Sequence, residues 1–157
     1  MNRSAFKLCG ALGLLVAVSI AQAETTVTNA WIRGTVPQQK ATGMFGQITS
    51  STGGKLVAAS SPAAATVEIH EMAMEGTVMK MREVSGGLDL PAGKPVALSP
   101  GGYHVMLLDL KHRLEPGDIV PMTLIVEGKD GRRESVEIQV PVKPLTTSAG
   151  DMSGMKH

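Results

Sequence analysis

Cysteine and aromatic residues are scarce in this sequence: its 157 residues include one Cys, one Trp, one Tyr and two Phe. The single cysteine, Cys9, lies in the N-terminal leader described below, so the exported part of the chain would contain no cysteine. Thioredoxin-like redox chemistry, blue-copper electron transfer and cysteine-based hydrolysis are therefore excluded, because each requires a cysteine side chain. A stabilising disulfide is excluded for the same reason.

An excess of charge of either sign is also missing, since 15 Lys and Arg residues face 14 Asp and Glu residues. This balance excludes a strongly basic nucleic-acid binder and an acidic disordered tail protein. With 43% hydrophobic and 18% charged residues, the chain can form a packed core, and its length suits one domain. Internal repeats, dinucleotide-binding and phosphate-binding glycine motifs and a nucleophile elbow are absent from the sequence as well.

The first 23 residues have the pattern of a signal peptide. Arg3 and Lys7 precede an apolar run over 8–20, and residues 21–23 read Ala-Gln-Ala, an A-x-A cleavage site. The run is shorter than the roughly 20 apolar residues of a membrane span, and Cys9 lies too early for a lipoprotein site. We expect cleavage after Ala23, export to the periplasm and no membrane span in the mature form; the alternative is an uncleaved anchor.

Beyond the leader, short segments of alternating apolar and polar residues follow one another, and no window has a sustained helical period. The predicted strands are 26–33, 41–50, 55–60, 66–72, 77–84, 103–110, 119–127 and 133–142. Such strands, separated by Gly- and Pro-rich turns, predict an all-β antiparallel Greek-key sandwich or barrel of about seven to nine strands over residues 24–145. The Ser-, Gly- and Met-rich segment 146–157 predicts a flexible tail.

Methionine is in excess: the chain has ten, where about three or four are usual for this length. Met and His recur two residues apart in 70–74, 79–81 and 104–106. Residues i and i+2 of a strand point to one face, so each segment can present its Met and His side chains together. If 66–84 forms a hairpin that turns near Glu75-Gly76, the first two segments face each other at about 4.5–5.5 Å between Cβ atoms.

This donor set favours Cu(I). Thioether sulfur is a soft, neutral ligand that forms no disulfide, and imidazole adds affinity, whereas hard cations need a carboxylate cluster that the sequence lacks. A structural zinc site would need cysteines at short spacing. The alternative is that these methionines fill the core, as we expect for Met44 and Met122, and that the histidines lie on the surface, as we expect for His112. The residues alone leave metal binding and core packing as comparable alternatives.

Around the Met and His segments 70–74, 79–81 and 104–106 the sequence resembles the PCuAC family of periplasmic copper chaperones, and the resemblance extends over about residues 27–142. The resemblance is carried by the segments 29–33, 41–45, 70–72, 79–82, 90–93 and 100–107. The family motif is a His, a Met after ten residues, and His-x-Met after about twenty-one more. His70, Met81, His104 and Met106 match it, with 22 residues between Met81 and His104; the extra residue falls in the Gly86-Gly87 loop, where insertions are tolerated.

The resemblance implies a cupredoxin-like sandwich, related in architecture to immunoglobulin domains, that holds one Cu(I) near its surface. The ligands it implies are His70, Met81, His104 and Met106, with Met72 and Met79 in reserve. Met79 and Met81 share a face, so the sequence does not decide between them. Some family members carry a C-terminal extension that holds Cu(II), and here the matching residues are Met152, Met155 and His157.

The function that the resemblance implies is delivery of copper to respiratory oxidase assembly. The partner would be a recipient copper protein of the oxidase or an assembly factor of the Sco type, and we expect a monomer with no nucleic-acid partner. One alternative is a copper-buffering or resistance protein without a dedicated recipient. Another is an exported enzyme, which we do not expect: His70-Glu71 begins like a zinc-protease motif, but position 74 is Met and the context is a strand. A purely structural or adhesive sandwich is the last alternative.

Overall fold

The computed structural model describes residues 24–146, which form ten β-strands and no helix. The strands are β1 (Thr25–Arg33), β2 (Ala41–Ser50), β3 (Gly54–Ser60), β4 (Ala64–Glu75), β5 (Val78–Glu83), β6 (Leu88–Leu90), β7 (Val96–Leu98), β8 (Tyr103–Leu110), β9 (Ile119–Gly128) and β10 (Arg133–Lys143). This described part therefore contains no helix that could cross a membrane. The predicted signal peptide, 1–23, and tail residues 147–157 lie outside it.

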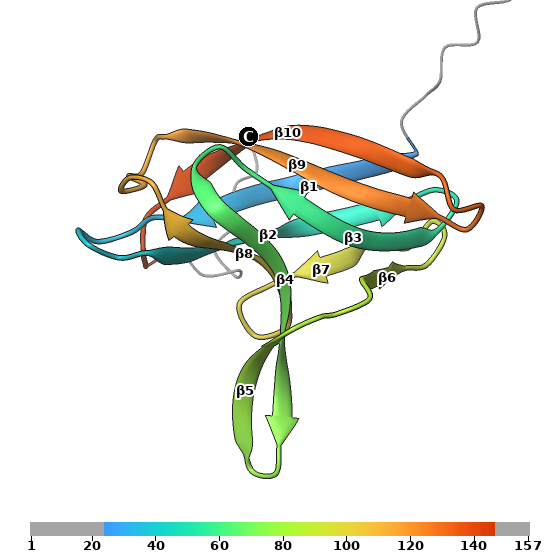
Figure 1. The fold of residues 1–157 in the computed structure, drawn as a ribbon, viewed down its shortest axis with the longest axis horizontal. Helices are drawn as coiled ribbons and strands as arrows, with labels where there is room; N and C mark the ends of the chain where they lie inside the picture. Colours follow the sequence, from blue (N-terminus) through green and yellow to red (C-terminus); the bar gives the residue numbers. More distant parts are fainter. Residues whose placement is uncertain (1–23, 147–157) are drawn as a thin grey trace, which may run out of the picture.

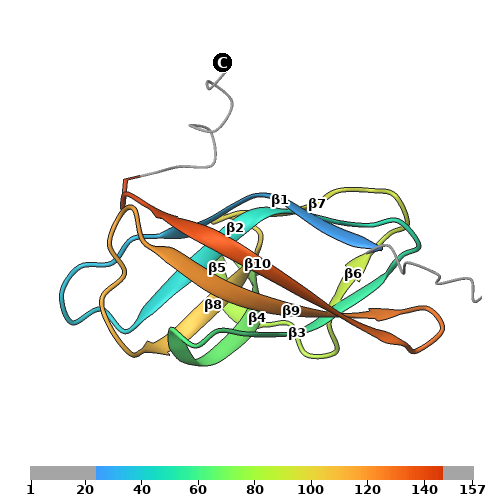
Figure 2. The same ribbon diagram turned by 90° about the horizontal axis from the view of Figure 1, so that it is seen from above.

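The strands form a sandwich whose two layers are joined at one edge (Figures 1 and 2). The strand order is β5-β4-β8-β2-β1-β10-β9-β3-β6, with β7 paired to β2. The layer of β10, β9 and β3 lies over the layer of β1, β2, β8 and β4 (Figure 2). The all-β sandwich predicted from the alternating segments is confirmed.

The core lies between the two layers because alternate residues of each strand face inward. On β9 the buried residues are Val120, Met122, Leu124 and Val126, and on β8 they include Val105 and Leu107. Met44 and Met122 belong to this core, as predicted. These two methionines are thus explained by packing, whereas Met74, Met79 and Met81 are exposed and need another explanation.

Three details of the predicted fold are wrong. The described residues form ten strands because the Gly- and Pro-rich stretch between 86 and 102 includes β6 and β7, which have three residues each and are too short to show alternation. The sandwich is not wholly antiparallel, since β1 and β10 pair in parallel at Ile32 and Val142. The fourth strand, predicted over 66–72, extends from Ala64 to Glu75.

The predicted hairpin is confirmed, and it projects from the sandwich (Figure 1). Among the strands of residues 24–146, β5 pairs with β4 alone, and all six residues of β5 are exposed. The turn between them contains Gly76, whose positive φ of 66° is readily adopted by glycine. In the register of the hairpin Met72 lies opposite Met81 and Met74 lies opposite Met79. One face of the projecting hairpin therefore carries four thioethers.

Truncation of a core side chain should destabilise the protein far more than truncation on this hairpin. Leu124→Ala removes a side chain that is fully buried, and we expect the free energy of unfolding to fall by about 2–5 kcal/mol. Met74→Ala removes a side chain that is 61% exposed, and we expect a change within about 0.5 kcal/mol. Urea unfolding followed by circular dichroism measures both; equal losses would contradict the assignment of the hairpin to the periphery.

Candidate metal centre

The two histidines of the predicted site lie side by side on the outer face of the sheet. His70 on β4 is the register partner of His104 on β8, and the centroids of their rings are 5.9 Å apart. Their chain neighbours Ile69 and Val105 point the other way, into the core. Although they lie on the outer face, both rings are buried, with 9% of His70 and 4% of His104 exposed.

The hydrogen bond at Nδ1 of His104 determines what its other nitrogen can do. Nδ1 lies 3.2 Å from the carbonyl oxygen of Gly102, which can only accept, so Nδ1 carries the proton and donates it. Nε2 of the neutral ring then holds a lone pair, and it lies 3.2 Å from Sδ of Met81. The imidazole nitrogen and the thioether sulfur thus face each other with no proton between them. This arrangement suits a cation that accepts a lone pair from each atom.

His70 offers a second free nitrogen. Its Nε2 donates to the Glu68 carboxylate at 2.7 Å, and its Nδ1 is buried without a hydrogen-bond partner among the described residues. Leaving a buried polar atom unpaired costs about 1–3 kcal/mol, so such an atom calls for an explanation. A histidine held by a carboxylate through one nitrogen and free at the other is the usual arrangement of a metal ligand and its supporting group.

A pocket of about 230 Å³ brings the sulfur donors to His104. It is lined by Met72, Met81, Met106 and His104, among others. Met106 follows His104 by two residues and shares its face of β8. Met79 does not line this pocket, because it lies opposite Met74 nearer the turn of the hairpin. Of the two methionines that the sequence left open, the structure therefore brings Met81, and not Met79, to His104.

An aromatic wall closes one side of the pocket. The ring of Phe45 lies 4.7 Å from that of Trp31 and 6.1 Å from that of His104, measured between centroids. The Phe45 ring covers Gly43, where the Cβ of any larger residue would lie only 2.6 Å from Cζ. The guanidinium of Arg33 lies 5.2 Å from the centroid of the Phe45 ring. The Phe45 ring thus packs between Trp31 and His104, and Arg33 puts a fixed positive charge at the pocket.

Burial lowers the pKa of His104 below its ordinary value of 6.5. Its hydrogen bond to the Gly102 carbonyl acts in the opposite direction, and the neighbouring His70 lowers the pKa further. The ring is consequently neutral at pH 7, which leaves the Nε2 lone pair available to a metal ion.

The groups that support these donors were not predicted from the sequence. The Glu68 carboxylate holds His70, and it could have been found because it precedes His70 by two residues on the same face of one strand. The Gly102 carbonyl, which orients His104, has no sequence signal. His112 is exposed, as predicted. The predicted tail ligands Met152, Met155 and His157 lie outside the described residues. Within 24–146, no three His, Cys, Asp or Glu side chains converge on a point.

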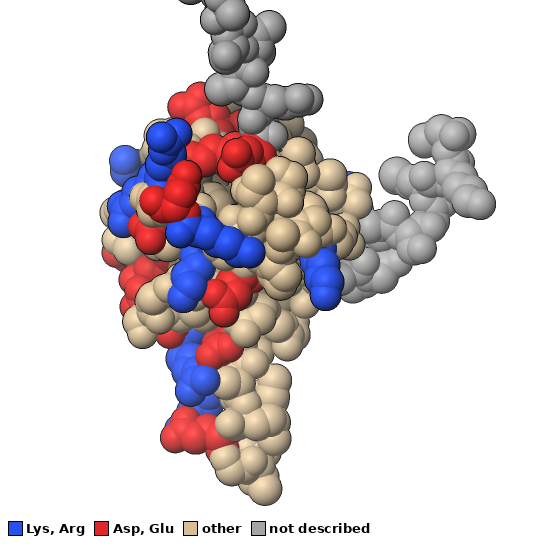
Figure 3. All heavy atoms as spheres, turned by 90° about the vertical axis from the view of Figure 1, so that its right-hand side faces the viewer, with Lys and Arg blue, Asp and Glu red and all other residues tan. Residues whose placement is uncertain are grey.

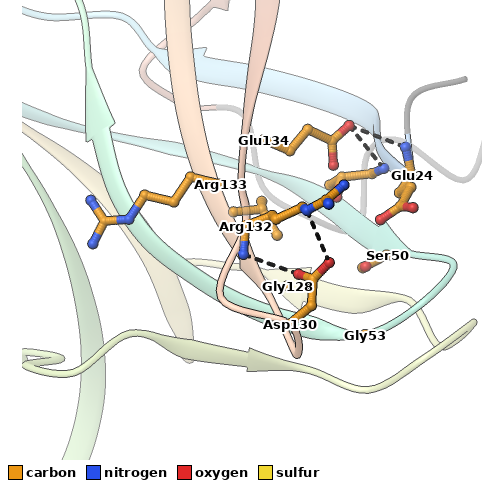
Figure 4. Close-up of a pocket in the computed structure, with 10 residues that line it drawn as sticks. Glu24, Ser50, Gly53, Gly128, Asp130, Arg132, Arg133 and Glu134 are labelled. Atoms are coloured by element: carbon orange, nitrogen blue, oxygen red, sulfur yellow. Dashed lines mark hydrogen bonds and ion pairs between the residues drawn. The ribbon is translucent and has the colours of Figure 1, made fainter. Parts of the chain in front are cut away.

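A second pocket, of about 380 Å³, has a different character (Figure 4). It lies between the start of β1 and the β9–β10 turn, and charged side chains line it. These groups pair with each other: the backbone N–H of Glu24 donates to Glu134 at 3.1 Å, and Arg132 lies 3.7 Å from Asp130. None of the described residues that line it has a thioether or an imidazole, so these residues offer no soft donor.

The sandwich with a His/Met pocket on the outer face of one layer is that of a PCuAC-type domain. The apo PCuAC domain from PmoF1 has 28% identity and a TM-score of 0.61, over 78% of this chain and 95% of that one. The solution structure of CuI-DR1885 from Deinococcus radiodurans has 29% identity and a TM-score of 0.58, over 81% and 83%. The copper-bound PCuAC domain from PmoF2, at 21% identity and a TM-score of 0.60, supports the fold alone.

The chain belongs to the LpqE-like family. The family's sequence profile, described as "Putative lipoprotein LpqE-like", matches residues 25–142. A relative, "Putative lipoprotein Lxx21020" of Leifsonia xyli subsp. xyli (strain CTCB07), is 32% identical over 130 residues, which make up 82% of this chain and 75% of the relative. The resemblance to PCuAC proteins found in the sequence is thereby confirmed.

The lowered pKa of His104 can be measured directly. In a proton NMR titration of the apoprotein, we expect the ring of His104 to titrate below the ordinary histidine value of about 6.5, because burial penalises its charged form. His104 is assigned from the signal that disappears in His104→Gln. A midpoint at or above 6.5 would contradict the buried, neutral ring described here.

Proposed function

We propose that the protein binds one Cu(I) ion as cargo through His70, Met81, His104 and Met106. The observation that carries this proposal is the 3.2 Å approach of Nε2 of His104 to Sδ of Met81, since both atoms present lone pairs. The unpartnered Nδ1 of His70 supports it further. Met106 completes the set from the strand that carries His104, and Met72 lines the same pocket as a further donor.

The chemistry of these donors favours Cu(I) over Cu(II) and over harder cations. Thioether and imidazole ligands carry no negative charge, two of the four are soft thioethers, and the carboxylate of Glu68 is engaged with His70. The positive charge of Arg33 at the pocket favours a monovalent over a divalent ion. The related DR1885 protein is described as a CuI form, which agrees with this choice of metal and oxidation state.

The placement of the donors suits a carrier. Met81 is 48% exposed on the projecting hairpin, whereas His104 is buried on the sheet. A ligand of a partner protein can therefore replace Met81 first, and the ion can pass through a complex in which both proteins hold it. No electron moves in this exchange, because thioether and imidazole lone pairs replace one another around an ion that stays Cu(I).

We infer that the recipient is a copper site of a respiratory oxidase or an assembly factor of the Sco type, as the PCuAC resemblance implies. Buffering of periplasmic copper without a dedicated recipient is the second candidate, and the same exposed donors would serve it. The leader and the lipoprotein names of the relatives support a place in the cell envelope, and we propose the periplasm. A Cu(II) site at Met152, Met155 and His157 remains a prediction, as does the absence of enzymatic activity.

Removal of a single donor should weaken Cu(I) binding. We expect His70→Ala, Met81→Ala, His104→Ala and Met106→Ala each to raise the dissociation constant at least about tenfold, because loss even of a supporting group changes metal affinity by about 10–100-fold. Glu68→Gln should raise it within that range. The measurement is an anaerobic titration of the purified protein against a chromogenic Cu(I) chelator.

His112→Ala is the matched control, since His112 is exposed and away from the pocket, and its affinity should equal that of the wild type. Circular dichroism shows whether each variant keeps its β-structure. Wild-type affinity in folded His104→Ala and Met81→Ala variants would refute the assigned site.

Delivery and buffering predict different phenotypes in a deletion strain. If the protein delivers copper, we expect oxidase activity to fall and to return when copper is added to the medium, because excess metal bypasses a carrier. A Met81→Ala gene should fail to restore activity at limiting copper, while a His112→Ala gene restores it. Increased copper sensitivity with normal oxidase activity would instead favour buffering.

A further inference from the structure

The projecting β4–β5 hairpin has two chemically different faces. One face carries the thioethers of Met72, Met74, Met79 and Met81. The other carries two ion pairs, Lys80 with Glu75 at 3.0 Å and Arg82 with Glu71 at 2.8 Å. In Figure 3 charged side chains line one side of the projection and uncharged side chains line the other. Solvation and charge pairing explain the second face, whereas the thioether face needs a reason to stay exposed.

Packing does not supply that reason at the outer end of the hairpin. Met74 and Met79 are direct register partners, 61% and 47% exposed, and neither belongs to the core or lines the His104 pocket. Burial of a methionine side chain stabilises a protein because it removes apolar surface from water, so two exposed methionines forgo most of this gain. We call this pair, Met74 and Met79, the tip pair.

The tip pair is aligned with the proposed site. Along each strand it lies two residues beyond the pair Met72 and Met81, which corresponds to roughly 6.4–6.8 Å. Met81 in turn touches Nε2 of His104. Soft donors therefore follow one another on one face, from the outer end of the hairpin to the buried histidine.

We propose that the tip pair is a second, weaker Cu(I) site through which the ion enters and leaves the His104 site. This inference rests on the proposed function. Two thioethers leave the ion incompletely coordinated, so the tip pair binds it less tightly than four donors do, and a ligand of a partner protein can fill the open position. The ion remains Cu(I) throughout: bonds to thioether sulfur form at one pair as they break at the next, and no proton or electron is transferred.

Methionine methyl NMR tests the site. Protein labelled at the methionine methyl carbons is titrated with Ag(I), a redox-inert soft cation, and then with Cu(I) under anaerobic conditions. We expect the first equivalent to shift the methyl signals of Met81 and Met106, and the second to shift those of Met74 and Met79 with at least tenfold lower affinity. Tip-pair signals that do not move with five equivalents, while Met81 and Met106 respond, would overturn this inference and leave the proposed function intact.

The double variant Met74→Leu and Met79→Leu separates metal binding from apolar contact, because leucine keeps the size and the apolar surface but has no sulfur. We expect it to lose the second binding event and to release Cu(I) to excess chelator several-fold more slowly than the wild type. Val78→Leu, at an equally exposed position on the charged face, is the matched control and should behave as the wild type. Wild-type release from the double variant would overturn the passage role. Failure of Met81 and Met106 to respond at all would overturn the proposed function and, with it, this inference.

Discussion

The register of β4 between its two neighbours is the constraint on which the site depends. One edge of β4 places His70 opposite His104, and the other places Met72 opposite Met81. Because side chains alternate along a strand, a slip of one residue would turn His70 into the core and expose Ile69. Ile69 is buried in the apolar core, so hydrophobic burial on one face of the strand aligns the donors on the other.

The donors are divided between a rigid and a less constrained part of the fold. His70, His104 and Met106 lie on strands paired at both edges, while Met81 lies on β5, which pairs at one edge only. The Gly102 carbonyl ties β8 to β4 beside the site, since it accepts hydrogen bonds from Nδ1 of His104 and from the backbone N–H of Met72. Such one-sided elements open at lower free energy than core strands. Loss of Met81 from the proposed site therefore requires no disruption of the core.

Features that depend on local patterns could be predicted from the sequence, whereas features that depend on pairing between distant segments could not. Alternation predicted the long strands, and Glu75-Gly76 predicted the hairpin whose register unites the Met and His segments. The parallel pairing of β1 with β10 joins residues more than a hundred positions apart and leaves no local pattern. Met79 and Met81 share one face of the hairpin, so the strand pattern does not show which of them lies near His104. That depends on how far the hairpin projects from the sheet. The support of His104 by Gly102 is a backbone contact, which no side-chain pattern encodes.

Thioether is the one sulfur donor that suits both the compartment and the exposure proposed here. A thiolate pair at the outer end of the hairpin would bind Cu(I) more tightly, but its exposure would favour disulfide formation in an oxidising compartment. Leucine would be chemically inert there and would bind nothing. Exposure also falls from the hairpin to the sheet: it is 61% at Met74, 47% at Met79 and 48% at Met81, but 4% at His104. The number of donors around the ion is also larger at His104 than at the outer end of the hairpin. If the affinity for Cu(I) follows this order, the fold captures the ion at the outer end of the hairpin and retains it at the buried histidine.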